Sequence, residues 1–203
     1  MEMISAFEST GLNWQLARFD EPAELLAAQL GDPSVGLGLN AESRKVEAFG
    51  ERLLLAHMLG GSVDLRHHGN GAPYMANDTR RISISHSKRY IAVASHPSRQ
   101  VGIDVEVNTN RAERLHQRFM RDDELLSAPS DWQLREKALA AWCAKEAAYK
   151  CLPVEGCDFL QDMRAEFSDG RIAVDYQGRR FVFDWRMTAQ YCLVVGGEGI
   201  FGE

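Results

Sequence analysis

The sequence lacks the features that would place it in a membrane or outside the cell. No stretch approaches the roughly 18 apolar residues that a membrane-spanning helix needs, so we expect no transmembrane segment. The first residues, Met-Glu-Met-Ile-Ser, have neither the basic start nor the long apolar run of a signal peptide. The four cysteines form no Cys-x-x-Cys pair. We therefore expect a cytoplasmic protein with reduced thiols.

Positive charge is also scarce. The chain has 23 Lys and Arg against 29 Asp and Glu, a formal net charge of −6. Because binding to nucleic-acid phosphates needs an excess of Lys and Arg, nucleic acid is a poor candidate for the main partner. No low-complexity segment or flexible linker interrupts the 203 residues, and 45% of them are hydrophobic. We therefore expect one compact unit with a substantial core.

A buried helix that carries charges is the most informative stretch. We expect it from about Asp131 to Leu152, beginning with a capping box between Ser130 and Gln133. The run is mostly Ala, Leu, Trp and Cys, yet Glu146 and Lys150 stand one turn apart on the same face. Buried charges need a partner or a function, although an ordinary Glu–Lys surface pair is the alternative interpretation.

A strand about forty residues upstream carries two further carboxylates. Val101, Ile103, Val105 and Val107 alternate with polar residues, which predicts a strand over 101–107 with one buried face. Asp104 and Glu106 then share the opposite face, where their charges repel unless a cation lies between them. With Glu146 they would make an all-oxygen site that suits Mg²⁺ beside a phosphate. An edge strand with a solvated face is the alternative.

These stretches together resemble a known family. Gly-Ile-Asp-Val-Glu at 102–106, followed by Trp-Cys-Ala-Lys-Glu-Ala-Ala-Tyr-Lys at 142–150, resembles the paired motifs of the Sfp-type 4′-phosphopantetheinyl transferases. Ile-Ser-Ile-Ser-His-Ser at 82–87 is similar to the Ser-His-Ser motif of that family. Gly-Ala-Pro-Tyr at 71–74 resembles its Gly-Lys-Pro segment, but Ala72 stands where many members have lysine.

The resemblance implies an α+β fold of two similar lobes related by a pseudo-twofold axis. Residues 1–104 would form the lobe that holds the CoA nucleotide, and residues 105–203 the lobe with the metal and the catalytic helix. The pattern offers a faint echo of this repeat, because each half has a long helix followed by a meander of strands. The first long helix is expected from Ala41 to Leu59, with Asn40 as its cap.

The same resemblance implies the reaction. A family member transfers 4′-phosphopantetheine from coenzyme A to a serine of an apo acyl or peptidyl carrier protein and releases adenosine 3′,5′-bisphosphate. The implied cofactor is Mg²⁺ or Mn²⁺, and the implied partners are coenzyme A and the carrier protein. A monomer is expected, since one chain holds both halves of the site. The class of enzyme would be a holo-[acyl-carrier-protein] synthase type of transferase.

Family roles pass to the matching positions of this chain. Asp104, Glu106 and Glu146 would hold the metal. Glu146, Lys150 and Asp104 would be catalytic, with Glu146 accepting the serine proton and Lys150 steadying the phosphate. The residues expected to bind coenzyme A are His86, Ser85, Lys145, Arg44, Arg52 and Pro73. For Arg44 and Arg52, a solvated helix face remains the alternative interpretation.

Other segments are expected as follows. A short basic helix, Arg111 to Met120, suits an acidic helical partner such as a carrier protein, or it simply packs its Leu and Phe. A further short helix begins at Asp122. Four strands are predicted at Met163–Phe167, Arg171–Tyr176, Arg180–Trp185 and Tyr191–Gly196.

Two other functions remain open at this stage. A metal-dependent nuclease or phosphohydrolase would also use an Asp-x-Glu pair with a later Glu and Lys, although the acidic composition argues against it. A catalytically silent protein that binds coenzyme A or a carrier is the second alternative, and the missing lysine at Ala72 leaves it open.

Overall fold

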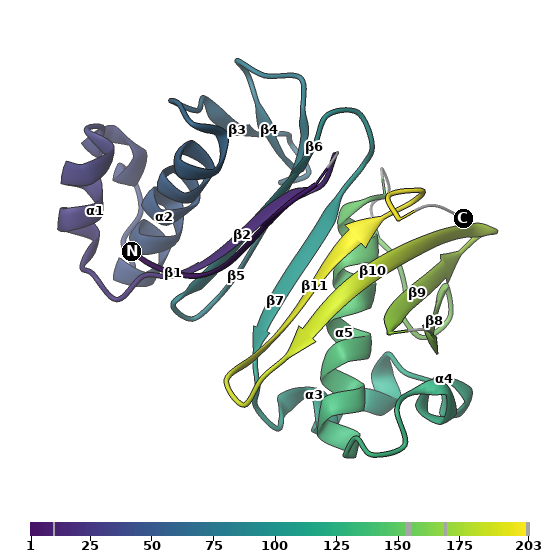
Figure 1. Ribbon diagram of the computed structural model, residues 1–203. Helices are drawn as coiled ribbons and strands as arrows, with labels where there is room; N and C mark the ends of the chain where they lie inside the picture. The colour runs from purple at the N-terminus through teal and green to yellow at the C-terminus, as the bar shows by residue number, and fades with distance from the viewer. Residues whose placement is uncertain (10, 153–155, 169, 202–203) are drawn as a thin grey trace. The chain divides into compact units, whose positions relative to one another are not determined.

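The protein divides into two compact units, Met1–Ser98 and Arg99–Glu203, in a computed structural model (Figure 1). The structure describes residues 1–9, 11–152, 156–168 and 170–201. We expected the boundary between the two lobes after residue 104, whereas the boundary between the two units lies before strand β7 (Gly102–Val107). The reason is pairing, because β7 lies against β11 (Tyr191–Gly197) of the second unit.

An antiparallel sheet with a long helix against it makes up the first unit. Its strand order is β1-β2-β6-β5, and a separate hairpin pairs β3 with β4. The strands are β1 (Glu2–Glu8), β2 (Asn13–Arg18), β3 (Leu65–His67), β4 (Pro73–Met75), β5 (Arg81–Ser87) and β6 (Tyr90–His96). Two short helical segments, α1 (Ala23–Leu30) and η1 (Pro33–Gly36), precede the long helix.

That long helix is α2 (Glu42–Leu59), close to the predicted range. The predicted cap was wrong, because the N-cap residue is Ala41 and no side chain bonds to the first turn. Gly60 ends the helix in the left-handed conformation, with φ of 74° and its N–H donating to the carbonyl of Ala56. Glu51 is a buried charged residue on this helix.

A five-stranded antiparallel sheet, in the order β7-β11-β10-β9-β8, forms the second unit. The remaining strands are β8 (Met163–Ser168), β9 (Arg171–Tyr176) and β10 (Arg179–Met187), so all four predicted C-terminal strands are confirmed. Helices and antiparallel sheets in both units confirm the mixed α and β class. The pseudo-twofold relation and the expected single compact unit stay predictions.

Helix α5 (Leu134–Lys150) covers one face of this sheet, as Figure 1 shows. Its capping box joins Gln133 and Glu136, one turn later than the box predicted from Ser130. The predicted burial is confirmed, since nine of its residues, including Ala147 and Cys143, are buried. They form one core with Val194 and other apolar residues of the sheet.

Gly102 allows this helix to approach β7 closely. A Cβ atom built at Gly102 would stand 1.9 Å from the carbonyl oxygen of Ala147 and 3.0 Å from Sγ of Cys151. The backbones of strand and helix therefore touch where any larger residue would hold them apart. The glycine of the Gly-Ile-Asp-Val-Glu stretch thus sets the distance between β7 and α5.

The segment between β7 and α5 is less regular than predicted. α3 (Arg111–Leu115) ends five residues early and continues as the 3₁₀ turn η2 (His116–Arg118), while Phe119 and Met120 turn into the core. α4 (Asp122–Ser127) follows where a short helix was expected.

In the parts of the chain that the structure describes, no helix is long and apolar enough to cross a bilayer.

Substituting Gly102 by Ala should destabilise the second unit. Because the new Cβ meets helix backbone rather than a movable side chain, we expect the free energy of unfolding to fall by about 1–3 kcal/mol. Urea unfolding followed by circular dichroism measures this. Gly69→Ala is the control, since a Cβ there meets no atom within 4 Å. Equal stability of the two variants would contradict the close approach.

Candidate functional site

The residues predicted to form a site divide between the two units. Asp104, Glu106, Lys145, Glu146 and Lys150 lie in the second unit. The predicted coenzyme A contacts other than Lys145 lie in the first unit, on α2, β4 and β5: Arg44, Arg52, Pro73, Ser85 and His86. Each group is described within its own unit.

The acidic face of β7 is the face that α5 covers. Asp104 pairs across the sheet with Val194, and Glu106 pairs with Cys192, both of which belong to the core beneath α5. Directly paired residues point to the same side of a sheet, so both carboxylates point toward the helix. β7 is an edge strand, as the alternative interpretation expected, but its acidic face is not solvated at Asp104, which is only 5% exposed.

Lys150 is the cation that meets this acidic face. Its Nζ donates to Oδ1 of Asp104 at 2.8 Å and to the carbonyl oxygen of Ile103 at 2.8 Å. The last turn of α5 is thereby bonded to the middle of β7. An ammonium held in this way keeps part of its surface, since the Lys150 side chain is 26% exposed, and it can still contact a ligand.

Glu146 lies one turn before Lys150 and feels the same charges. Its pKa is raised to about 7, chiefly by burial and also by the carboxylates of Asp104 and Glu106, while Lys150 opposes the rise. The pKa of the Cys143 thiol is raised as well, chiefly by burial and also by Cys192, Asp104 and Glu106. The three carboxylates are therefore close enough to repel one another.

The donor chemistry of this group fits a hard divalent cation. Mg²⁺ takes oxygen ligands, usually one or two carboxylates with waters and substrate phosphates, and it relieves the repulsion that raises the pKa of Glu146. Within residues 1–9, 11–152, 156–168 and 170–201, no three His, Cys, Asp or Glu side chains stand in a ready-made metal arrangement. Asp104 is paired with Lys150 through its Oδ1, so a cation would share this carboxylate with that ammonium.

Lys145 points away from the acidic group and into the core. It is fully buried, and its ammonium bonds to Glu124 and to backbone carbonyl oxygens. Burial lowers the pKa of Lys145, and the neighbouring Glu124 opposes that shift. The expected contact between Lys145 and a phosphate does not fit this position, because a phosphate cannot reach an ammonium that is enclosed by protein oxygens.

In the first unit, His86 lies between two carboxylates of α2. Its Nδ1 is 3.7 Å from Oε1 of Glu47, and its Nε2 is 3.5 Å from Oε1 of Glu51. The pKa of Glu51 is raised to about 7, chiefly by burial and also by Glu47, against the lowering effects of Arg52 and Arg44. Sequence reasoning missed both glutamates, although their spacing of four residues on a helix was a usable signal.

The other predicted residues of the first unit have varied surroundings. Arg44 is exposed and forms an ion pair of 3.0 Å with Glu47. Arg52 donates to the carbonyl oxygens of Ala48 and Leu65, so its guanidinium ties α2 to β3. Ser85 is buried in β5, and Pro73 begins β4. The solvated-face interpretation holds for Arg44 but not for Arg52, which is partly buried.

Glu51→Gln should change stability in a way that depends on pH. A carboxyl whose pKa is raised on folding binds its proton more tightly in the folded state, so the folded protein loses stability as pH rises from about 4.5 to about 7. Glutamine cannot ionise. Relative to wild type, the variant should therefore gain up to about 3 kcal/mol between pH 5 and pH 8.

Urea unfolding at the two pH values measures this difference, with Glu24→Gln, which changes an exposed carboxylate on α1, as the control. His86, Glu47, Arg44 and Arg52 are the charged or titratable groups that face Glu51. An equal loss of stability in Glu51→Gln at both pH values would contradict the prediction. It would mean that the carboxylate is ionised throughout and is held by His86.

The comparison with protein families covers the acidic strand and the charged helix together. Residues 100–198 match the model of the 4′-phosphopantetheinyl transferase superfamily, a span that begins just before Gly102 and ends after β11. No curated protein in the set compared with it matches the chain. The matched span contains Asp104, Glu106, Glu146 and Lys150. The resemblance to the 4′-phosphopantetheinyl transferases that the motifs predicted is therefore confirmed over residues 100–198.

Proposed function

We propose that this protein transfers 4′-phosphopantetheine from coenzyme A to a serine hydroxyl of an apo acyl or peptidyl carrier protein. Adenosine 3′,5′-bisphosphate is the other product. The observation that carries the proposal is the group of three carboxylates and one ammonium between β7 and α5, within the span that matches the family. Phosphoryl transfer is catalysed by positioning and by neutralising charge, and these groups suit both tasks.

In the proposed reaction the serine oxygen forms a bond to the β-phosphorus of coenzyme A, and the bond from that phosphorus to the bridging oxygen breaks. The serine proton passes to Glu146, directly or through a water. A pKa of about 7 suits a general base at neutral pH, because enough carboxylate is present and its affinity for the proton is high. The electron pair of the broken bond leaves with the adenosine bisphosphate.

Lys150 would stabilise the charge that develops on the leaving phosphate. Its ammonium is fixed by Asp104 and by the carbonyl oxygen of Ile103, so it needs little reorganisation during the reaction. Asp104, Glu106 and Glu146 would hold Mg²⁺, or Mn²⁺ in its place. When bound, that cation would neutralise the diphosphate of coenzyme A.

The remaining contacts are proposals for individual residues. His86, Ser85, Pro73, Arg44 and Arg52 would contact coenzyme A, and Lys145 is left out because its ammonium is enclosed. Exposed arginines on α3 and η2, Arg111, Arg114 and Arg118, support an acidic carrier as the protein partner. We propose a cytoplasmic monomer of the holo-[acyl-carrier-protein] synthase type.

Intact mass of a carrier protein tests this function directly. An apo acyl carrier protein and an apo peptidyl carrier protein are each incubated with the protein, coenzyme A and Mg²⁺. A gain of one phosphopantetheine that EDTA prevents is the expected result. Coenzyme A binding without any gain would favour the silent binder. Cleavage of DNA in the presence of Mg²⁺, with no increase in the mass of either carrier protein, would favour the nuclease.

Glu146→Gln should abolish most of the transfer. The amide keeps the size of the side chain but cannot accept the serine proton or offer a negative oxygen to a cation, so we expect kcat to fall by about 10²–10³. Initial rates with saturating coenzyme A measure it. The control is Glu166→Gln, which removes an exposed carboxylate paired with Arg180. An unchanged rate in Glu146→Gln would refute its role as base.

A further inference from the structure

The ammonium of Lys145 has four oxygen neighbours inside the second unit. Its Nζ is 2.7 Å from Oε1 of Glu124 and donates to the carbonyl oxygens of Phe119 at 2.6 Å, Phe159 at 2.9 Å and Met163 at 3.2 Å. These oxygens come from four places in the chain around α5. The one side chain thereby fixes the helix to the turn before α4, to α4, to the segment before β8 and to β8 itself.

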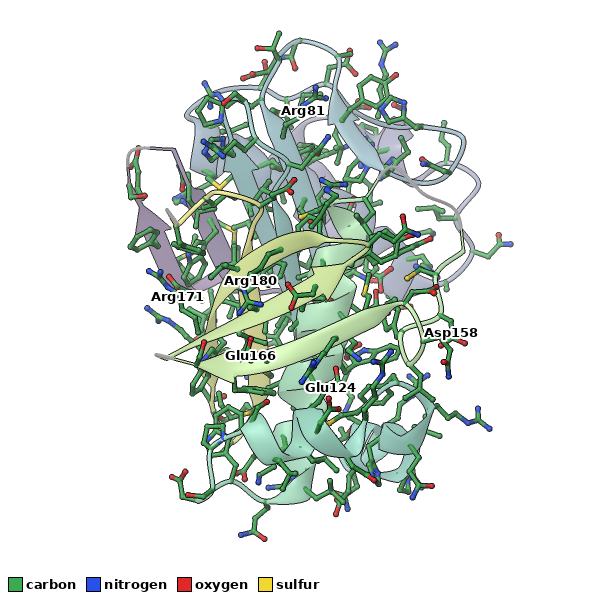
Figure 2. The ribbon with its side chains drawn as sticks, turned by 90° about the vertical axis from the view of Figure 1, so that its right-hand side faces the viewer. Arg81, Glu124, Asp158, Glu166, Arg171 and Arg180 are labelled. Carbon is green, nitrogen blue, oxygen red and sulfur yellow. The ribbon has the colours of Figure 1, made fainter. Side chains whose placement is uncertain are left out.

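Glu124 extends these contacts to the edge of the sheet. Its Oε1 also accepts the backbone N–H of Ala165 in β8, and its Oε2 accepts the N–H of Arg121 at the start of α4. Figure 2 labels Glu124 where α4 lies beside the sheet. A second bond joins the same elements, because the N–H of Phe167 donates to Oγ of Ser127. α4, β8 and α5 therefore meet at one carboxylate.

One face of α5 carries all of these contacts. Helical spacing places Trp142, Lys145 and Tyr149 on one face. The Trp142 ring packs against the rings of Phe119 and Phe159, and the Tyr149 ring packs against Phe159. The ammonium of Lys145 bonds to the backbone carbonyl oxygens of the same two phenylalanines. Glu146 follows Lys145 in sequence, so its side chain projects about 100° around the helix. The acidic face of β7 therefore meets one side of α5 while Lys145 holds another.

An apolar side chain in place of Lys145 would tolerate small shifts of the helix, because van der Waals contacts are non-directional. Hydrogen bonds to four oxygens do not tolerate such shifts. A buried ion pair rarely adds stability compared with apolar residues of the same size, and its best-attested use is to select one register. The Lys145–Glu124 pair has the position and the geometry for that use.

We propose that Lys145 and Glu124 are positioning residues, which fix the rotation and the height of α5 over the sheet so that Glu146 and Lys150 face Asp104. Neither residue touches the reacting atoms. The kinetic part of this inference rests on the proposed transferase function. The structural part, a local loss of order in the last turns of α5, does not depend on that function.

The experiment compares three variants with a matched control. Lys145→Met removes the ammonium, Glu124→Gln keeps size and one acceptor oxygen, and the double variant Glu124→Met with Lys145→Met removes both charges. Lys137→Met makes the same change two turns earlier on α5, at a partly exposed position. Thermal unfolding selects temperatures at which every variant is folded, and the double variant shows whether stability returns without the pair.

Two readouts decide the inference. In transfer assays, kcat of Lys145→Met and of the double variant should fall by about 10²-fold with the KM for coenzyme A unchanged, because a misplaced base slows chemistry without weakening binding. Glu124→Gln should retain more activity, and Lys137→Met should match wild type. A double variant with restored stability and wild-type kcat would overturn the proposal.

Hydrogen exchange measured by mass spectrometry gives the second readout, with or without activity. Lys145→Met and the double variant should raise exchange about tenfold in a peptide covering 143–152, relative to peptides of β9 and β10. A uniform rise over the whole unit would mean a global loss of stability and would overturn the proposal. A wild-type protein that transfers nothing would refute the proposed function, while the exchange data would still decide the positioning role.

Discussion

The close approach of α5 to β7 is the constraint on which the rest of the second unit depends. Gly102 has no side chain, and the carbonyl oxygen of Ala147 occupies the space that a Cβ would need. At this distance, Lys150 reaches both the carboxylate of Asp104 and the backbone of β7. The pKa of Glu146 is raised to about 7, chiefly by burial under this packing and also by the charges of Asp104 and Glu106. A larger residue at 102 would separate these charges.

Charged side chains buried beneath a helix cost free energy unless they are paired or bind a ligand. Those around α5 form two separate groups. The acidic group at β7 gathers three carboxylates of like charge, which suits a divalent cation and a base. The Lys145–Glu124 pair is balanced and has hydrogen bonds to backbone groups on several sides. The first group has the properties of a reactive site, and the second those of a fixed support.

Much of the second unit could be predicted from local patterns. The alternation of Ile103 and Val105 gave the strand, and the spacing of Glu146 and Lys150 gave the shared helix face. The face of β7 that α5 covers could not be predicted, because it depends on pairing with β11, a strand about ninety residues away in the sequence. Nor could the burial of Lys145, since its oxygen partners are mostly backbone carbonyls, which a sequence does not single out. Glu51 was missed because a charged residue on a helix is usually solvated.

The measurement that tests this account most directly is a Mg²⁺ titration followed by ¹H–¹⁵N NMR spectra of the intact chain. If the acidic group of β7 and α5 holds the cation, saturable shift changes should be confined to residues 102–107 and 143–150, and Asp104→Asn should remove them. Shift changes in the acidic segment around Asp158 and Asp162 instead, or none at all, would contradict the account.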